Sequence, residues 1–129
     1  MAGKRNKVIP QGEWKWFGHA GHFICGAWCR FHLCTLIGKY VVSTVGDYHG
    51  VMQIRDKGER TKAEEIGCGR KYETLVFKGN GETCTAAGCA CGLPSIDPSE
   101  IDSLCCNTAG EATKNHYALC AKWARRQKP

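Results

Sequence analysis

Residues 14–48 read WKWFGHAGHFICGAWCRFHLCTLIGKYVVSTVGDY and carry the strongest strand signals of the chain. Side chains alternate from Cys29 to Ile37, and a run rich in β-branched residues extends from Tyr40 to Val45. Gly38-Lys39 between them suits a two-residue hairpin turn. This stretch therefore predicts an antiparallel hairpin, around which the rest of a β-sheet is arranged.

The alternation within residues 29–37 gives the first strand of this hairpin two distinct faces. The face better suited to a core holds Phe31, Leu33, Thr35 and Ile37. The opposite face holds Arg30, His32, Cys34 and Leu36. We therefore expect Arg30, His32 and Cys34 to line up together away from the core.

The C-terminal part of the sequence predicts a helix from about Ala109 to Arg125. Thr108 and Glu111 form a capping-box pattern at its start, and its basic end complements the helix dipole. Helical spacing predicts an inward stripe of Ala112, His116, Leu119, Cys120 and Trp123. Shorter helices are predicted over Thr61–Ile66 and from Asp97, where Asp-Pro-Ser-Glu is typical of a helix start.

Together these patterns predict an α+β fold, a single small domain in which an antiparallel β-sheet has the C-terminal helix packed on one face. The strands are expected at about residues 14–18, 22–24, 29–37, 40–46 and 72–78. Turn residues over 78–81 are expected to end the last strand. Residues 1–13 are expected to form a flexible basic arm, followed by the domain at 14–129.

The composition of the 129 residues favours a globular cytoplasmic protein, with 43% hydrophobic residues. No apolar run approaches the roughly 20 residues that span a bilayer, and no apolar segment follows the first basic residues as in a secretory signal. We therefore expect no membrane association. Ten cysteines in a reducing compartment favour metal or thiol chemistry over structural disulfides, although buried free thiols are the simpler interpretation.

The formal net charge of +6 is unevenly distributed. No Lys or Arg occurs between Gly79 and Thr113, whereas basic residues gather near the two ends of the sequence: Lys4, Arg5, Lys7, Lys122, Arg125, Arg126 and Lys128. Basic ends suit a polyanionic partner such as a nucleotide, a nucleic acid or an acidic protein. Solubility and a favourable helix C-terminus are the alternative explanation.

Histidine and cysteine residues are dense between positions 19 and 34, where nitrogen and sulfur donors suit tetrahedral zinc. The candidate ligands of a structural zinc ion are His19, His22, Cys25, Cys29 and His32. Their spacing is not that of a zinc finger, and loop histidines with packed cysteines are the alternative. A second group, Cys84, Cys89, Cys91, Cys105 and Cys106, could supply thiolates or a labile disulfide, but neighbouring Cys105 and Cys106 diverge.

Catalytic motifs are missing from the sequence. It has no G-x-S-x-G, no HExxH, no phosphate-binding Gly-rich loop ending in Gly-Lys-Ser/Thr, and no zinc-deaminase signature. A cysteine near a histidine, such as Cys29 with His32, leaves a small Cys- or metal-dependent hydrolase as an alternative. The balance of these observations favours a protein that is not an enzyme.

Aromatic and basic residues suggest a binding surface instead, because rings stack on bases and cations hold phosphates. The candidate ligand-binding residues are Trp14, Trp16, Trp28, Arg30, Tyr48, Arg70 and Lys71. The alternative is that these rings form the core of a small sheet. An exposed ring pair close to Arg30 or Arg70 would favour ligand binding.

Three segments, GHAGHFICGAWCRFHLCTLIGKYVVSTVGDY, IGCGRKYETLVFKG and NTAGEATKNHYALCAKWA, resemble a group of small uncharacterised proteins of tailed bacteriophages and prophages. The resemblance covers most of the chain after Glu13 and implies a phage accessory protein made in the cytoplasm of an infected bacterium. The resemblance assigns no catalytic or binding residue to this sequence.

Phage proteins of this kind suggest a counter-defence role by analogy. We therefore expect a non-enzymatic protein that binds a nucleotide signal or a host nucleoprotein or nuclease complex. A zinc-stabilised nucleic-acid-binding protein and the hydrolase are the alternatives. The sequence does not decide whether the chain forms homo-oligomers.

Overall fold

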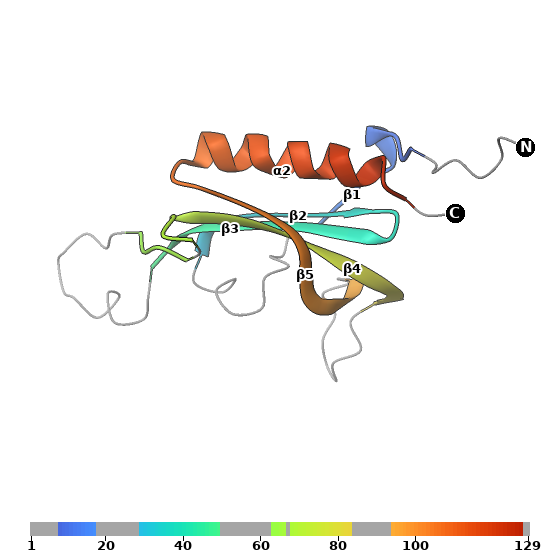
Figure 1. Cartoon of the computed structure of the whole chain (residues 1–129), viewed down its shortest axis with the longest axis horizontal. Helices are drawn as coiled ribbons and strands as arrows, with labels where there is room; N and C mark the ends of the chain where they lie inside the picture. The colour runs from blue at the N-terminus through green and yellow to red at the C-terminus, as the bar shows by residue number, and fades with distance from the viewer. Residues whose placement is uncertain (1–7, 18–28, 50–62, 67, 84–93, 128–129) are drawn as a thin grey trace, which may run out of the picture.

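The computed structural model describes residues 8–17, 29–49, 63–66, 68–83 and 94–127. Five strands form one antiparallel sheet in the order β1-β2-β3-β4-β5, and the C-terminal helix α2 lies across one face of it (Figure 1). The elements are η2 (Gln11–Glu13), β1 (Lys15–Phe17), β2 (Cys29–Ile37), β3 (Tyr40–Tyr48), β4 (Tyr72–Thr83), β5 (Pro94–Cys106) and α2 (Ala109–Ala124). The predicted small α+β domain with a C-terminal helix on its sheet is confirmed.

The predicted central hairpin is present, with β2 and β3 paired from Cys29↔Tyr48 to Ile37↔Tyr40. Gly38 in its turn has a φ of 58°, in the left-handed region that glycine occupies without strain. A side chain at Gly38 would also collide with Gln127, since an added Cβ would lie 2.1 Å from its Oε1. The turn therefore requires glycine for both its backbone conformation and its packing.

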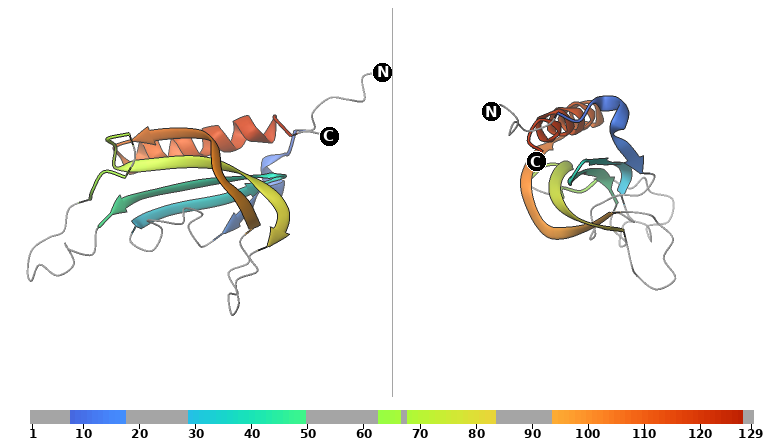
Figure 2. Two further views of the ribbon diagram at one scale, coloured as in Figure 1. Left: turned by 60° about the horizontal axis from the view of Figure 1, so that its bottom comes forward. Right: turned by 90° about the vertical axis from the view of Figure 1, so that its right-hand side faces the viewer.

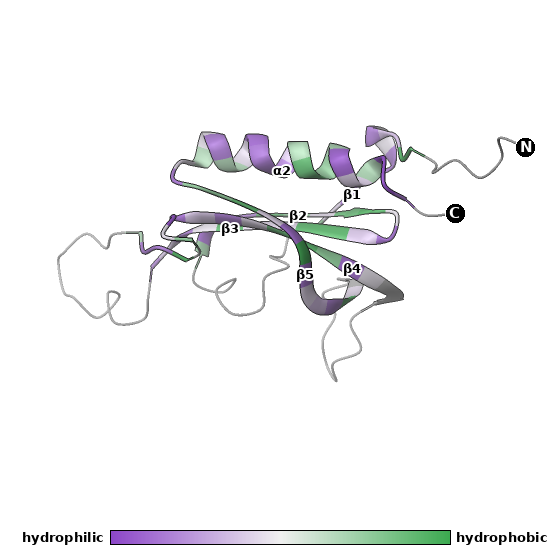
Figure 3. Ribbon diagram, viewed as in Figure 1, coloured by the Kyte–Doolittle hydropathy of each residue, from purple (hydrophilic) through white to green (hydrophobic). Residues whose placement is uncertain are grey.

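The core lies between α2 and the centre of the sheet. Its buried members come from β2, β3, β4 and α2, and they are Ile37, Tyr40, Val42, Val76, Leu119, Cys120 and Ala124. Half-buried Trp14 and Trp123 pack against this cluster. Figure 3 shows hydrophobic and hydrophilic residues alternating around the turns of α2, as expected for a helix with one buried side.

The predicted inward stripe of α2 is confirmed at its first four members. Ala112, His116, Leu119 and Cys120 are all buried, whereas Trp123 is half-buried at the edge of the core. Trp123 packs on Tyr40, with ring centroids 4.7 Å apart. Asp102 on β5 accepts hydrogen bonds from the Lys122 Nζ at 2.6 Å and the Trp123 Nε1 at 2.9 Å, which tie β5 to the helix.

The prediction for the two faces of β2 is correct for Thr35 and Ile37, which are fully buried, and for Arg30 and His32, which are exposed. It is wrong for Cys34, which has no exposed surface. The reason is that the centre of the sheet is buried on both faces. On β3, Val42 faces the helix while its neighbours Val41 and Ser43, on the opposite face, are buried as well.

Two predicted short helices are wrong. In the described part of residues 61–66, Glu64 forms an isolated antiparallel bridge with Tyr48, and its N–H donates to the Tyr48 carbonyl at 2.7 Å. Asp97 lies within β5, where its carboxylate accepts the N–H of Ser99 at 3.0 Å. Glu64 is paired with Tyr48, and the residues on either side of Asp97–Ser99, Ile96 and Glu100, are paired with β4, so pairing with distant strands overrides the local helix signals.

The predicted end of β4 at residues 78–81 is also wrong, because the strand continues to Thr83. Its pairing with β5 is irregular after Val76, and the N–H of Gly79 donates to the Lys39 carbonyl at 2.7 Å. Figure 2 shows the strongly curved sheet that results. The glycines here thus bend a strand and do not end it.

Candidate ligand-binding surface

The predicted ligand-binding residues fall into two groups at different places on the sheet. Trp14 and Trp16 lie at β1, beside the helix. Arg30, Tyr48, Arg70 and Lys71 belong to the other end of the sheet, where β2 begins, β3 ends and β4 begins. Trp28 lies outside the described residues. The structure therefore does not unite the predicted set.

The first group forms an aromatic surface together with a residue of α2. We use the term aromatic surface for Trp14, Trp16 and Tyr117. The rings of Trp16 and Tyr117 have centroids 5.4 Å apart, and those of Trp14 and Tyr117 are 6.4 Å apart. Trp16 is 43% exposed and Tyr117 is 42% exposed. Large rings exposed to this extent on neighbouring elements offer an apolar area to a ligand, although the ring planes of Trp16 and Tyr117 are inclined by 47° to each other.

Each ring of the aromatic surface is held by a different part of the fold. Trp14 donates its Nε1–H to the Ile9 carbonyl at 3.3 Å, and the N–H of Ile9 donates to the Ala124 carbonyl at 3.0 Å. Trp16 is fixed by the pairing of β1 with β2, opposite Thr35. Tyr117 stands on α2. The surface therefore exists only when the N-terminal segment, the sheet edge and the helix are assembled.

A buried polar network lies beneath the aromatic surface. The His116 Nε2 is 2.8 Å from the Thr35 hydroxyl, and its Nδ1 is 2.7 Å from the Thr44 hydroxyl. The Thr44 hydroxyl in turn lies 2.7 Å from that of Thr74. Burial lowers the pKa of His116 to about 4, so the ring is neutral near pH 7. Its centroid lies 5.5 Å from that of Trp16, and it supports the exposed ring from below.

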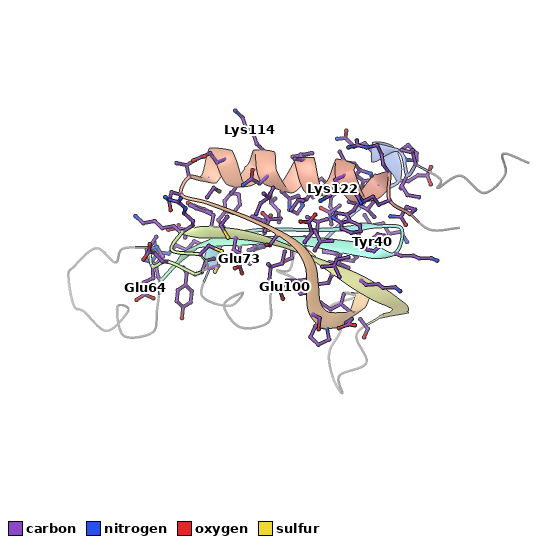
Figure 4. The ribbon with its side chains drawn as sticks, viewed as in Figure 1. Tyr40, Glu64, Glu73, Glu100, Lys114 and Lys122 are labelled. Atoms are coloured by element: carbon purple, nitrogen blue, oxygen red, sulfur yellow. The ribbon has the colours of Figure 1, made fainter. Side chains whose placement is uncertain are left out.

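Positive charge accompanies the aromatic surface along α2. Lys114 is exposed one helical turn before Tyr117, and Figure 4 shows its side chain pointing away from the sheet. At the other end of the helix, the Lys122 Nζ and the Arg126 Cζ lie 5.7 and 5.8 Å from the centroid of the Trp123 ring. Of these cations, Lys122 is paired with Asp102 on β5, so Lys114 and Arg126 are the charges that α2 offers to a ligand on either side of Tyr117.

The second group surrounds a histidine–carboxylate pair at the end of β3. The His49 Nε2 lies 2.8 Å from the Asp47 Oδ1, and Asp47 has a φ of 52°, which is unusual outside glycine. Within the described part of the chain, the buried Nδ1 of His49 has no hydrogen-bond partner. Tyr72 lies close to this end, and its pKa is raised by burial, by the Asp47 carboxylate and by Cys106.

The ring of Tyr72 fills the space over Gly46, where an added Cβ would lie 2.0 Å from its Cδ2. Phe31 meets Tyr72 edge-on at 5.4 Å. Arg30, Arg70 and Lys71 are exposed around this end, while Tyr48 is half-buried. Here the aromatic rings pack mainly on one another, so this group offers less open ring area than the aromatic surface.

The predicted zinc ligands are only partly within the described residues. His19, His22 and Cys25 lie outside them. Cys29 is buried and His32 is exposed on β2, and their spacing places them on opposite faces of the strand. No group of three or more His, Cys, Asp or Glu in the described part of the chain could hold a metal ion.

The buried thiols are poor nucleophiles. Burial raises the pKa of both Cys34 and Cys120 to about 12, and burial also raises that of Cys106. A thiol must lose its proton to attack a substrate, and these remain protonated at neutral pH. As predicted from their adjacency, Cys105 and Cys106 point to different faces of β5: Cys106 donates to the Thr108 carbonyl at 3.5 Å, and Cys105 contacts Cys68.

Tyr117 is the residue of the aromatic surface that the sequence did not identify. It follows His116 and falls outside the inward stripe of the helix, so the sequence pattern predicts only that its ring is exposed to solvent. Its contact with Trp16 depends on which edge of the sheet the helix covers.

The described residues contain no helix long and apolar enough to cross a membrane.

Comparison with known proteins adds no assignment to this geometry. No protein-family model matches the chain, no curated protein matches it, and no solved structure matches it.

Proposed function

We propose that this is a non-enzymatic phage accessory protein that acts in the cytoplasm of the infected bacterium against host defence, by binding a nucleotide signal or a host nucleoprotein or nuclease complex. The observation that carries the proposal is the exposed pair of Trp16 and Tyr117, whose rings lie 5.4 Å apart on β1 and α2. The phage origin rests on the sequence resemblance alone.

The chemistry of this surface suits a nucleobase. Bases stack on aromatic rings with about 1–3 kcal/mol per base, whatever the sequence, and nearby cations hold the phosphates. Lys114 lies on the exposed side of α2, next to Tyr117 in the helical repeat. The net charge of +6 favours approach of any polyanion.

A nucleic-acid partner is the second candidate, and the basic end of α2 favours it. Arg125 and Arg126 are exposed there, whereas the Lys122 ammonium is paired with the Asp102 carboxylate. A longer polyanion could follow the helix from Lys114 to Arg126 and contact several phosphates, whereas a single nucleotide would use only the ring pair. The two candidates therefore differ in how strongly binding should depend on salt.

To test this, the purified protein is titrated with mono-, di- and cyclic nucleotides and with a single-stranded oligonucleotide. Tryptophan fluorescence and calorimetry measure the binding of each. We expect W16L and Y117L each to weaken binding by roughly five- to 150-fold, the equivalent of one lost stacking contact. I101A is the matched control, because Ile101 is 44% exposed on β5, distant in the sheet from β1.

Unchanged affinity in both ring variants would show that another surface binds. Failure of every nucleotide and oligonucleotide to bind would contradict the nucleotide form of the proposal. A steep fall in affinity with salt for the oligonucleotide alone would favour the nucleic-acid partner. Capture from infected cells with the wild-type and doubly substituted W16L/Y117L proteins would then identify a partner that depends on the rings.

A further inference from the structure

Two cysteines far apart in the sequence meet at the edge of the sheet. Cys68 lies in the turn before β4, which is closed by a hydrogen bond from the Ile66 N–H to the Arg70 carbonyl at 2.8 Å. Cys105 lies near the end of β5, opposite Glu73 of β4. The N–H of Lys71 donates to the Asn107 Oδ1 at 3.2 Å, which holds the turn against the end of β5.

The two thiols lie next to each other: the Lys71–Asn107 hydrogen bond holds the turn of Cys68 against the end of β5, and a hydrogen bond with the Cys68 side chain is among the causes that raise the pKa of Cys105. Cys68 is exposed, and Cys105 is half-buried beside it. Small oxidants in solution can therefore reach the pair through Cys68. Cys34 and Cys120 differ in this respect, since both are fully buried between or beneath other side chains.

We propose that Cys68 and Cys105 form a redox-active dithiol, a site that a small-molecule disulfide such as oxidised glutathione converts into an intramolecular disulfide. The exposed sulfur of Cys68, after loss of its proton, attacks one sulfur of the glutathione disulfide. A mixed disulfide forms and one glutathione thiol leaves. The sulfur of Cys105 then loses its proton and displaces the second glutathione thiol, so two electrons and two protons pass from the protein to glutathione.

The order of these steps follows from the surroundings of the two sulfurs. Burial, the hydrogen bond with Cys68 and the nearby Glu73 carboxylate raise the pKa of Cys105 to about 12. Cys105 is therefore a poor first nucleophile. It attacks the mixed disulfide on Cys68, where the short distance between the sulfurs raises their effective concentration and compensates for the small thiolate fraction of Cys105. Cys106 cannot take its place, because its thiol is directed to the Thr108 carbonyl on the other face.

Disulfide formation would fasten the turn before β4 to the edge strand β5. A bond between residues 68 and 105 closes a long loop of the unfolded chain and so favours the folded state. In a reducing cytoplasm the pair would be a dithiol, and it would respond to oxidative conditions. This inference is independent of the binding function proposed above.

The test treats the full-length reduced protein with oxidised glutathione, blocks the remaining thiols, and maps disulfides by mass spectrometry after digestion with trypsin and an acid-specific protease. The second protease separates Cys105 from Cys84, Cys89 and Cys91. We expect a cross-linked peptide containing Cys68 and Cys105. It should be lost in C68S and C105S and kept in C106S, the matched control.

Two outcomes would overturn the proposal: a stable glutathione adduct on Cys68 as the main product, or a bond from Cys68 to any cysteine other than Cys105. A second measurement does not depend on mapping. The melting temperature should be higher for the oxidised than for the reduced wild-type protein, and this difference should vanish in C68S, whose exposed position keeps the variant folded. Equal melting temperatures of the two wild-type forms would contradict the proposal.

Discussion

At the scale of single residues, His116 decides how the helix is attached to the sheet. It has no exposed surface, and both of its ring nitrogens are bonded to threonine hydroxyls of β2 and β3. A neutral imidazole has one donor and one acceptor nitrogen, and a hydroxyl can serve either of them. The ring therefore joins the Thr35 hydroxyl of β2 to the Thr44–Thr74 hydroxyl pair of β3 and β4, so both of its buried nitrogens have partners.

The depressed pKa of His116 predicts a dependence of stability on pH. In the unfolded chain the ring takes up a proton near pH 6.5, whereas in the folded protein it does so only near pH 4. The unfolded state thus binds more protons between these values, and the free energy of unfolding should fall as the pH drops from about 6.5 to about 4. The loss due to this group is at most about 3 kcal/mol.

Urea unfolding at a series of pH values measures this loss. H116Q supplies the comparison, because glutamine has a donor and an acceptor but does not titrate. We expect the variant to be less stable at pH 7 and to have a flatter profile between pH 4 and 6.5. An identical slope in the two proteins would show that other groups cause the acid sensitivity.

At the scale of elements, the start of α2 is fixed by Thr108, the N-cap residue of the helix. The Thr108 hydroxyl accepts the N–H of Glu111 at 3.1 Å, and it also donates to the Glu111 Oε1 at 3.0 Å. The side chain thereby satisfies a backbone N–H that the first turn of a helix leaves without a partner. The Thr108 cap also sets where the chain leaves β5 and enters the helix.

Removing this cap should lower the free energy of unfolding. T108A is expected to cost about 1 kcal/mol, within the usual 0.5–2 kcal/mol for an N-cap threonine. T113A is the matched control, because the Thr113 hydroxyl only donates to the Ala109 carbonyl at 2.9 Å inside the helix, where alanine is the better helix former. Chemical denaturation of both variants checks the prediction, and equal stabilities would contradict the role assigned to the cap.

The elements that the sequence predicted correctly have local determinants. The hairpin over 29–48 follows from alternation and a glycine turn, and the helix after Thr108 follows from its cap. The helix predicted from Asp97 is wrong because β4 pairs with Ile96 and Glu100 on either side of Asp97, and a partner distant in the sequence leaves no local signal. For the same reason, only part of the aromatic surface could be predicted. Trp16 lies in a strand that the sequence indicates, but its contact with Tyr117 depends on tertiary packing.

At the scale of the whole molecule, Gln127 joins the end of the helix to the central hairpin. Its Nε2 donates to the Ile37 carbonyl at 3.0 Å and to the Trp123 carbonyl at 2.8 Å, and its Oε1 accepts the Lys39 N–H at 3.1 Å. The side chain is buried, with 5% of its surface exposed. One amide thus connects the turn at Gly38 with residues almost ninety positions away.

Replacing Gln127 should destabilise the whole domain. Q127A leaves the Ile37 carbonyl and the Lys39 N–H without these partners, and an unsatisfied buried group costs about 1–3 kcal/mol. R126A, next to it and exposed, is the matched control, and it should lose only the contact of its guanidinium with the Trp123 ring, about 0.5–1 kcal/mol. Thermal and urea unfolding measure both variants. A Q127A protein as stable as R126A would rule out the amide as a connection between helix and hairpin.

The position of α2 after all five strands has a consequence for synthesis of the protein. The face that Leu119, Cys120 and Ala124 cover belongs to strands that are made first, and its cover and the Gln127 amide are made after them. At about 5–20 residues per second, the ribosome needs roughly one to four seconds to pass from Cys106 to Gln127. During that interval the strands carry an uncovered apolar face, and a nascent chain stalled there would be a natural target for chaperones.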